Sequence, residues 1–320
     1  MGRNPRRHCT DVREDRVSTK PTYREVECAS ALNRVRGMPF EWSLNPYKGC
    51  VHGCRYCFAR AYHVRMDRDV GAGFDREIDV KVNFINVLRR ELQKRPQGSV
   101  AIGTATDPYQ PCEGRYRLTQ GALSALCEFP MAVTIITKST LIVRDIALLR
   151  RLSNTLEGNL RVCFSVPTLD AEVWRRAEPG TPPPAQRMRA LSMLRDAGID
   201  AGVLCAPVLP GLTDSTESLD QVAAAASAAR ATFFGWRPLK LDPEIRDYYF
   251  EFISREFPVL SGAYARIYAG GAHSPRSYQD ALDDRLAAIK RRYGLADRYR
   301  AEAVGSRSTP SRPAQLTLAI

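Results

Sequence analysis

Six short apolar runs alternate with longer helical patterns along the middle of the chain, and this alternation constrains the fold more than any other feature. The runs are continuously apolar, which is typical of strands buried on both faces of a sheet. We predict strands at Phe40–Asn45, Ser99–Thr104, Ala132–Thr137, Leu160–Val166, Ala201–Ala206 and Phe233–Leu239.

Helical patterns fill the gaps between the runs. In the first gap, apolar residues recur at Phe84, Val87, Leu88 and Leu92, the spacing of one helix face. The repeated order of strand and helix implies right-handed crossovers and a parallel sheet, either open and doubly wound or curved into an incomplete barrel. In both forms an active site belongs at the carboxyl ends of the strands. The predicted helices are Asn83–Arg95, Thr119–Cys127, Asp145–Asn154, Pro184–Ala197 and Asp214–Arg230, with closing helices at Pro243–Phe257 and Tyr278–Tyr293.

The composition excludes several classes of protein. Hydrophobic residues make up 44% and charged residues 26% of the 320 residues, as in ordinary globular proteins. No apolar stretch approaches the roughly 18 residues that span a bilayer, and no apolar run follows the basic start, so we expect a cytoplasmic protein that does not enter a membrane. The net charge of +12, from 47 basic and 35 acidic residues, favours a polyanionic partner such as nucleic acid.

Three of the nine cysteines lie within eight residues, in the segment N-P-Y-K-G-C-V-H-G-C-R-Y-C-F-A-R that ends at Arg60. Cys50, Cys54 and Cys57 are spaced C-x3-C-x2-C, directly after the first predicted strand. Three thiolates on one compact loop can hold three corners of a cubane iron–sulfur cluster. Because no fourth cysteine lies nearby, one iron is left open for a ligand. The other six cysteines are scattered, at Cys9, Cys28, Cys112, Cys127, Cys163 and Cys205.

The alternative interpretation of this loop is a zinc site completed by His52 or His63. Zinc sites of this type usually combine two well-separated cysteine pairs, and no second pair exists in this sequence. The pattern therefore favours a [4Fe–4S] cluster. We expect His52 to shield the cluster, and Tyr56 and Phe58, which flank Cys57, to lie over it.

In the segment with Cys50, Cys54 and Cys57, the sequence resembles the radical S-adenosylmethionine (SAM) superfamily, whose cysteine loop follows the first strand of a partial (β/α)6 barrel. More narrowly, it resembles the spore photoproduct lyase-like group, also called DNA repair photolyases, over about Met38–Leu219. The narrower resemblance rests on G-T-A-T-D-P-Y-Q-P-C-E at Gly103–Glu113, T-K-S at Thr137–Ser139, F-S-V at Phe164–Val166, E-P-G-T-P at Glu178–Pro182 and A-P-V-L-P-G-L-T-D at Ala206–Asp214.

The resemblance implies an α/β partial TIM barrel and SAM as a second cofactor. It implies that Lys138 and Ser165 contact this cofactor. Tyr56 and Phe58 are cofactor-binding candidates because of their positions beside Cys57, with ordinary core or loop aromatics as the alternative. A solvated loop charge is the alternative for Lys138. The candidate catalytic residues, all beyond the second strand, are Asp107, Tyr109, Cys112 and Glu113, although Asp107 could instead cap a turn.

One position departs from the lyase. In the lyase a cysteine near the second strand donates hydrogen to the substrate radical, and the matching residue here is Thr104. A hydroxyl cannot replace the thiol, because its O–H bond is much stronger than an S–H bond. Cys112 is a candidate substitute, and a small buried apolar role is the alternative.

The sequence thus predicts a radical SAM enzyme that cleaves SAM reductively to a 5′-deoxyadenosyl radical. An external flavodoxin- or ferredoxin-like protein would supply the electron, and the substrate, with nucleic acid as one candidate, is open. We expect residues 1–37 to form a polar extension, residues 38–300 the catalytic domain and residues 301–320 a disordered tail. The alternative is a nucleic-acid-binding protein with a structural iron–sulfur or zinc site.

Overall fold

A computed structural model of the chain describes residues 20–296 and 317–318. Its main sheet has eight strands in the order β10-β9-β8-β7-β6-β3-β2-β11. The six strands from β10 to β3 run parallel, which confirms the predicted α/β partial barrel. These six strands are β3 (Trp42–Leu44), β6 (Ser99–Ile102), β7 (Ala132–Thr137), β8 (Leu160–Ser165), β9 (Ala201–Val208) and β10 (Phe234–Pro238).

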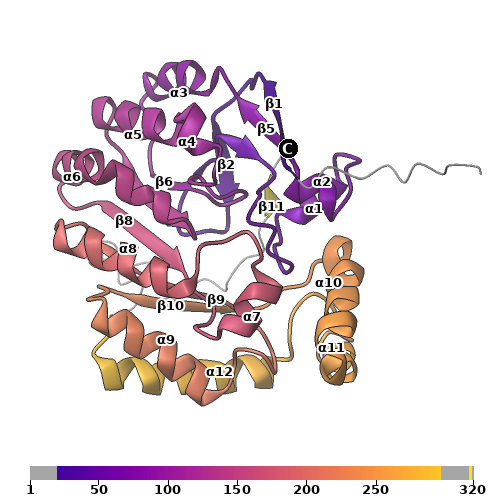
Figure 1. Cartoon of the computed structure of the whole chain (residues 1–320). Coiled ribbons are helices and arrows are strands. Elements are labelled where there is room, and N and C mark those ends of the chain that lie inside the picture. The colour runs from indigo at the N-terminus through magenta and orange to yellow at the C-terminus, as the bar shows by residue number, and fades with distance from the viewer. Residues whose placement is uncertain (1–19, 297–316, 319–320) are drawn as a thin grey trace, which may run out of the picture.

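All six predicted strands are present, and β7 has the predicted bounds. The outer side of the sheet is covered by α3, α5, α6, α8 and α9 (Figure 1). Between the strands and these helices lies the main apolar core, which includes Leu88, Leu123, Leu149 and Leu191. The helices are α3 (Phe84–Leu92), α5 (Leu118–Glu128), α6 (Ile146–Thr155), α8 (Pro184–Asp196) and α9 (Thr216–Ala228).

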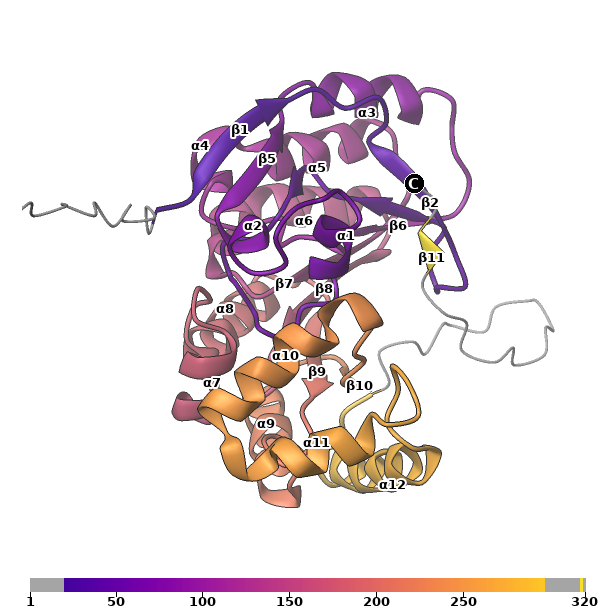
Figure 2. The ribbon, with the colours of Figure 1, turned by 90° about the vertical axis from the view of Figure 1, so that its right-hand side faces the viewer.

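Shorter elements connect the barrel units and close its end. The predicted closing helices form, with α10 against α1 and α12 against α9 (Figure 2). None of the described helices is long and apolar enough to cross a membrane. The remaining helices are α1 (Arg60–Val64), α2 (Ala72–Asp75), α4 (Glu113–Tyr116), η1 (Thr140–Asp145), α7 (Ala171–Ala177), α10 (Pro243–Glu256), η2 (Pro258–Leu260), α11 (Ser261–Ile267) and α12 (Arg276–Tyr293).

Residues 20–37, the described part of the predicted polar N-terminal extension, contain two strands. β2 (Leu32–Arg36) pairs antiparallel with β3 and so joins the main sheet. β1 (Thr22–Val26) pairs with β5 (Glu77–Lys81), and β4 (Tyr47–Lys48) pairs with the other edge of β5. Residues 1–19 lie outside the described part.

The predicted C-terminal tail also lies outside the described residues, except for Thr317 and Leu318. These two form β11, which pairs with Arg36 and Val35 of β2. No other part of residues 301–320 is described.

The carboxylate of Glu91, on helix α3, fixes the start of β2 to that helix. One oxygen of Glu91 accepts hydrogen bonds from the backbone N–H groups of Ala31, at 3.0 Å, and Leu32, at 2.8 Å. Ala31 and Leu32 are themselves buried in the main core. The N-terminal strands are therefore part of the folded unit.

We expect Glu91→Ala to lower the free energy of unfolding by about 1–3 kcal/mol, because two buried amide donors lose a charged acceptor. Urea unfolding measures this change. The control is Glu128→Ala, which removes an exposed ion pair with Arg89 and should cost at most about 1 kcal/mol. Equal losses in the two variants would contradict the role assigned to Glu91.

Candidate active site

The cysteine loop, residues 49–59, connects β4 to α1 at the carboxyl end of the barrel strands. Two of its turns are closed by backbone hydrogen bonds, from Gly53 to the carbonyl of Cys50 at 3.1 Å and from Cys57 to the carbonyl of Cys54 at 3.2 Å. Gly49 has φ +79°, and a Cβ there would lie 2.8 Å from the carbonyl oxygen of Glu77. A glycine is therefore required where the loop begins.

The loop after β6 holds the cysteine loop from one side. The Thr106 hydroxyl donates to the carbonyl of Gly49 at 2.6 Å, and the Gln110 amide donates to the same carbonyl at 3.1 Å. The side-chain oxygen of Gln110 in turn accepts from the backbone N–H of Val51 at 3.1 Å. All three side-chain contacts fix the backbone on either side of Cys50.

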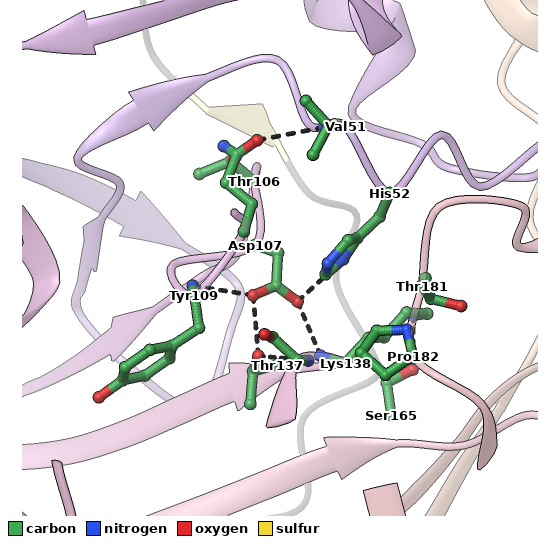
Figure 3. A network of polar contacts seen from close by, with 12 residues as sticks. Val51, His52, Thr106, Asp107, Tyr109, Thr137, Lys138, Ser165, Thr181 and Pro182 are labelled. Carbon is green, nitrogen blue, oxygen red and sulfur yellow. Dashed lines mark hydrogen bonds and ion pairs between the residues drawn. The ribbon is translucent and has the colours of Figure 1, made fainter. Parts of the chain in front are cut away.

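Asp107 is the centre of a buried network at the ends of β6 and β7 (Figure 3). Its carboxylate accepts from the Thr137 hydroxyl at 2.8 Å and from the backbone N–H groups of Lys138 at 2.7 Å and Tyr109 at 2.9 Å. It also lies 3.3 Å from Nδ1 of His52 in the cysteine loop. Burial raises the pKa of Asp107, but His52 and these hydrogen bonds outweigh burial and lower it. Asp107 thus positions backbone rather than merely capping a turn.

A second buried carboxylate, Glu178, contacts the loop through Tyr56. It forms an ion pair with Arg187 at 2.5 Å, and both side chains are almost wholly buried. The Tyr56 hydroxyl also donates to Glu178. Burial raises the pKa of Glu178, and the charges of Arg187 and Lys138 more than offset this effect and lower it.

Gly180 brings the segment after Glu178 against the cysteine loop. Its N–H donates to the carbonyl of His52 at 3.0 Å. A Cβ at this position would lie 2.2 Å from the carbonyl oxygen of Val51 and 3.0 Å from the Cα of His52. The two backbones touch only because residue 180 has no side chain.

Lys138 and Ser165, the two predicted cofactor contacts, lie side by side. The Lys138 ammonium donates to the Ser165 hydroxyl at 2.7 Å, lies 5.8 Å from the ring centroid of Tyr56 and is 3.8 Å from Glu178. The side chain of Lys138 is only 16% exposed, so the alternative of a solvated loop charge does not describe it. A cation and a hydroxyl therefore face the cysteine loop from the ends of β7 and β8.

Two buried arginines of this site were missed by the sequence analysis. Arg187 donates to Glu178, to the hydroxyl of Thr181 and to the carbonyl of Ser165. Arg60 donates to the carbonyls of Cys54 and Gly53. Arg60 closes the cysteine segment, but nothing in its sequence context indicates burial.

Three of the candidate catalytic residues face the core instead. Glu113 is fully buried and accepts from the backbone N–H groups of Thr119, at 3.0 Å, and Gln120, at 3.1 Å, at the start of α5. Cys112 and Tyr109 belong to the main apolar core. Burial raises the pKa of Cys112 to about 12. These contacts support the small apolar role for Cys112.

Thr104 and Phe58 have simple surroundings. The Thr104 hydroxyl accepts from the side-chain amide of Asn45 at 3.1 Å. Phe58 is half-buried and packs edge-on against Tyr62, with 6.3 Å between ring centroids. Neither contact assigns a chemical role.

The family model described as the Radical SAM superfamily matches residues 44–223. The chain belongs to the radical SAM superfamily. An uncharacterized protein of Mycobacterium bovis is 41% identical over 288 residues, covering 87% of this chain and 83% of that protein. A radical SAM Nalpha-GlyT isomerase of Pseudomonas phage M6 is 27% identical over 169 residues, covering 52% of this chain and 33% of that protein.

Solved structures of spore photoproduct lyase share the fold. A mutant with dinucleoside spore photoproduct has a TM-score of 0.62 and 15% identity, over 87% of this chain and 81% of that chain. Another, with bound AdoMet and dinucleoside spore photoproduct, has a TM-score of 0.60 and 16% identity, over 87% and 82%. The likeness shows a common radical SAM barrel.

The cysteine loop fits the [4Fe–4S] cluster that radical SAM proteins carry. Burial raises the pKa of all three thiols, that of Cys54 to about 12, so thiolates here need cationic partners, which iron supplies. For Cys50 the charge of Asp107 adds to the rise in pKa, and a backbone hydrogen bond from Asp107 opposes it; for Cys57 the charge of Arg60 and a backbone hydrogen bond from Ala59 lower the pKa. The loop thus combines thiols with hydrogen-bond donors suited to a cluster.

The histidines do not complete a zinc site with these thiols. His52 binds Asp107, and His63 packs edge-on against Phe74 with 5.2 Å between ring centroids. Among the described residues, no three His, Cys, Asp or Glu side chains are grouped around one point as a single metal ion requires. A cubane does not require that grouping, because each cysteine binds a different iron.

We expect Asp107→Ala to lower the free energy of unfolding by about 3–5 kcal/mol, because it leaves several buried hydrogen-bond donors without an acceptor. Chemical denaturation measures this. The control is Asp196→Ala, which removes an exposed partner of Arg230 and should cost at most about 1 kcal/mol. A loss at position 107 no larger than in the control would show that the network does not hold the site.

Proposed function

We propose that this radical SAM protein binds a [4Fe–4S] cluster on Cys50, Cys54 and Cys57 and uses it to cleave SAM. The observation that carries the proposal is the juxtaposition of this loop with Lys138 and Ser165 at the carboxyl end of the barrel. When bound and reduced by an external flavodoxin- or ferredoxin-like donor, the cluster supplies the electron that breaks the sulfonium C–S bond, giving methionine and a 5′-deoxyadenosyl radical.

The chain's own residues have distinct tasks in this proposal. The three thiolates would hold three irons of the cluster, and the fourth iron would be open to the amine and carboxylate of SAM. Lys138 contributes a positive charge and Ser165 a hydroxyl, and these suit the carboxylate. The Lys138–Ser165 hydrogen bond of 2.7 Å supports this assignment, because one anionic group could reach both. Tyr56, which lies beside Lys138 and donates to Glu178, would form part of the wall of the cofactor site.

The direct test is anaerobic reconstitution with iron and sulfide, followed by reduction with dithionite and addition of SAM. We expect about four irons and four sulfides per chain and formation of 5′-deoxyadenosine. Cys54→Ala should lose the cluster and the product. Cys127→Ala is a matched control, because Cys127 packs at the edge of the apolar core on α5. A fully loaded protein that forms no 5′-deoxyadenosine, or a protein with one zinc and no iron, would refute the proposal.

The role of Lys138 is tested by Lys138→Met, which retains length and apolar volume. The variant should still bind the cluster, but SAM should change the electron paramagnetic resonance spectrum only at concentrations about tenfold higher or more, since a charge-assisted contact is lost. Lys94→Met, at an exposed position in the loop after α3, is the control. An unchanged SAM dependence in Lys138→Met would remove this residue from the cofactor site.

We infer that a nucleic acid is a candidate substrate. The support is the net charge of +12 and the presence of dinucleoside spore photoproduct in a protein of the same fold. Because Thr104 stands where the lyase has its cysteine, reversal of a thymine dimer by the lyase's route is not proposed. The non-enzymatic alternative, a nucleic-acid-binding protein with a structural cluster, rests on the same charge.

A salt titration of DNA binding tests the polyanion argument. If phosphate contacts dominate, the logarithm of the affinity should fall linearly with the logarithm of the salt concentration. Labelled single- and double-stranded DNA would be compared. Affinity that does not change with salt would exclude a phosphate-driven interface, whereas DNA binding without SAM cleavage would favour the non-enzymatic alternative.

A further inference from the structure

Arg60 is a wholly buried arginine that directly follows the cysteine loop and contacts its backbone. Its guanidinium donates to the carbonyl of Cys54 at 3.0 Å and to that of Gly53 at 2.9 Å. It also donates to the carbonyls of Val70, at 2.7 Å, and Gly71, at 3.2 Å. One side chain thus ties the middle of the cysteine loop to the segment before α2.

The positive charge of Arg60 is paired with one carboxylate, that of the partly exposed Asp75. Asp75 lies 2.7 Å from the guanidinium and its side chain is 20% exposed, whereas that of Arg60 is 0% exposed. The guanidinium also lies 4.8 Å from the ring centroid of Phe74 and 4.6 Å from that of Tyr248. A buried cation so fully supplied with acceptors has a fixed position.

Both charges lie close to the cysteine loop. The Arg60 guanidinium is 3.0 Å from the carbonyl oxygen of Cys54, and a Cβ placed at Gly53 would lie 3.4 Å from Oδ2 of Asp75. Both charges therefore act electrostatically on a cluster bound by this loop. Reduction adds one negative charge to a cluster, so a nearby cation favours the reduced form and a nearby anion disfavours it. Local net charge and hydrogen bonds are main determinants of cluster potentials.

We propose that Arg60 is a positioning residue that shapes the cysteine loop for cluster binding, and that Arg60 and Asp75 together set the cluster's reduction potential. This inference rests on the proposed function only in requiring a cluster on the three cysteines. Arg60 raises the potential, Asp75 lowers it, and the backbone contacts of Arg60 fix the distance of both charges from the loop. The pair therefore decides how strong a reductant the cluster needs.

The test compares Arg60→Gln, Arg60→Lys and Asp75→Asn in the full chain after anaerobic reconstitution. Iron and sulfide per chain are measured, and the midpoint potential is determined by a redox titration followed by electron paramagnetic resonance. Arg60→Gln should hold less cluster, at a more negative potential. Arg60→Lys keeps the charge but loses the planar fork, so its cluster content should fall while its potential stays nearer to that of the wild type. Asp75→Asn should shift the potential in the positive direction.

Arg89→Gln is the matched control, because Arg89 forms an exposed ion pair with Glu128 on α5; its cluster content and potential should equal those of the wild type. Opposite shifts of the midpoint potential in Arg60→Gln and Asp75→Asn support the inference, because a merely structural role does not predict shifts of opposite sign. An unchanged potential in either variant, or shifts of the same sign, overturns it. If Arg60→Gln does not fold, Asp75→Asn alone decides by the direction of its shift.

These outcomes are separable from the proposed function. A wild-type protein that holds the cluster but does not cleave SAM refutes the proposed function, while the potentials of the variants still judge Arg60 and Asp75. A wild-type protein that takes up no iron overturns both.

Discussion

The buried carboxylate of Asp107 joins three parts of the molecule that are separate in sequence. It binds backbone N–H groups of its own loop and of the end of β7, and it holds His52 in the cysteine loop. Since β6 and β7 are adjacent parallel strands, their carboxyl ends present these donors side by side. Asp107 therefore fixes the cysteine loop relative to the ends of β6 and β7. The position of the cysteines depends on how these two strands are aligned.

Several charged side chains are buried or half-buried around the cysteine loop. Arg60 pairs with Asp75, Lys138 and Arg187 pair with Glu178, and His52 pairs with Asp107. Burying such groups costs free energy unless each is paired and hydrogen-bonded. Here the contacts to backbone carbonyls and amides meet that condition, so the site can hold fixed charges before any cofactor arrives. Preorganised charge of this kind suits chemistry in which the cofactor carries out the reaction and the protein orients it.

The sequence alone predicts the barrel and the ligand loop well. The six barrel strands are continuous apolar runs, and the cysteines carry their own spacing signal. β1 and β5 were missed because their sequences, TYREV and EIDVK, mix charged with apolar residues; they form the edge and the centre of a small three-stranded sheet. β2 was missed for a similar reason: its apolar residues are only Leu32 and Val35, between Asn33 and two arginines.

Side-chain partnerships were harder to predict, because they depend on the folded backbone. Arg187 and Arg60 belong to the site through contacts with carbonyls and carboxylates that no spacing rule reveals. Conversely, the sequence favours Glu113 as a catalytic candidate, but in the structure it caps α5 from within the core. Burial of a charged residue can be inferred only when its partners are known.

The contact at Gly180 has a consequence for attempts to alter what this site accepts. The segment from Glu178 to Pro182 faces the cysteine loop and would be an obvious target for a library of variants. At position 180, however, even a methyl group would collide with main-chain atoms of Val51 and His52, which cannot rotate away as a side chain can. Diversity introduced there would displace the ligand loop itself, so a useful library must leave this residue unchanged and vary its neighbours.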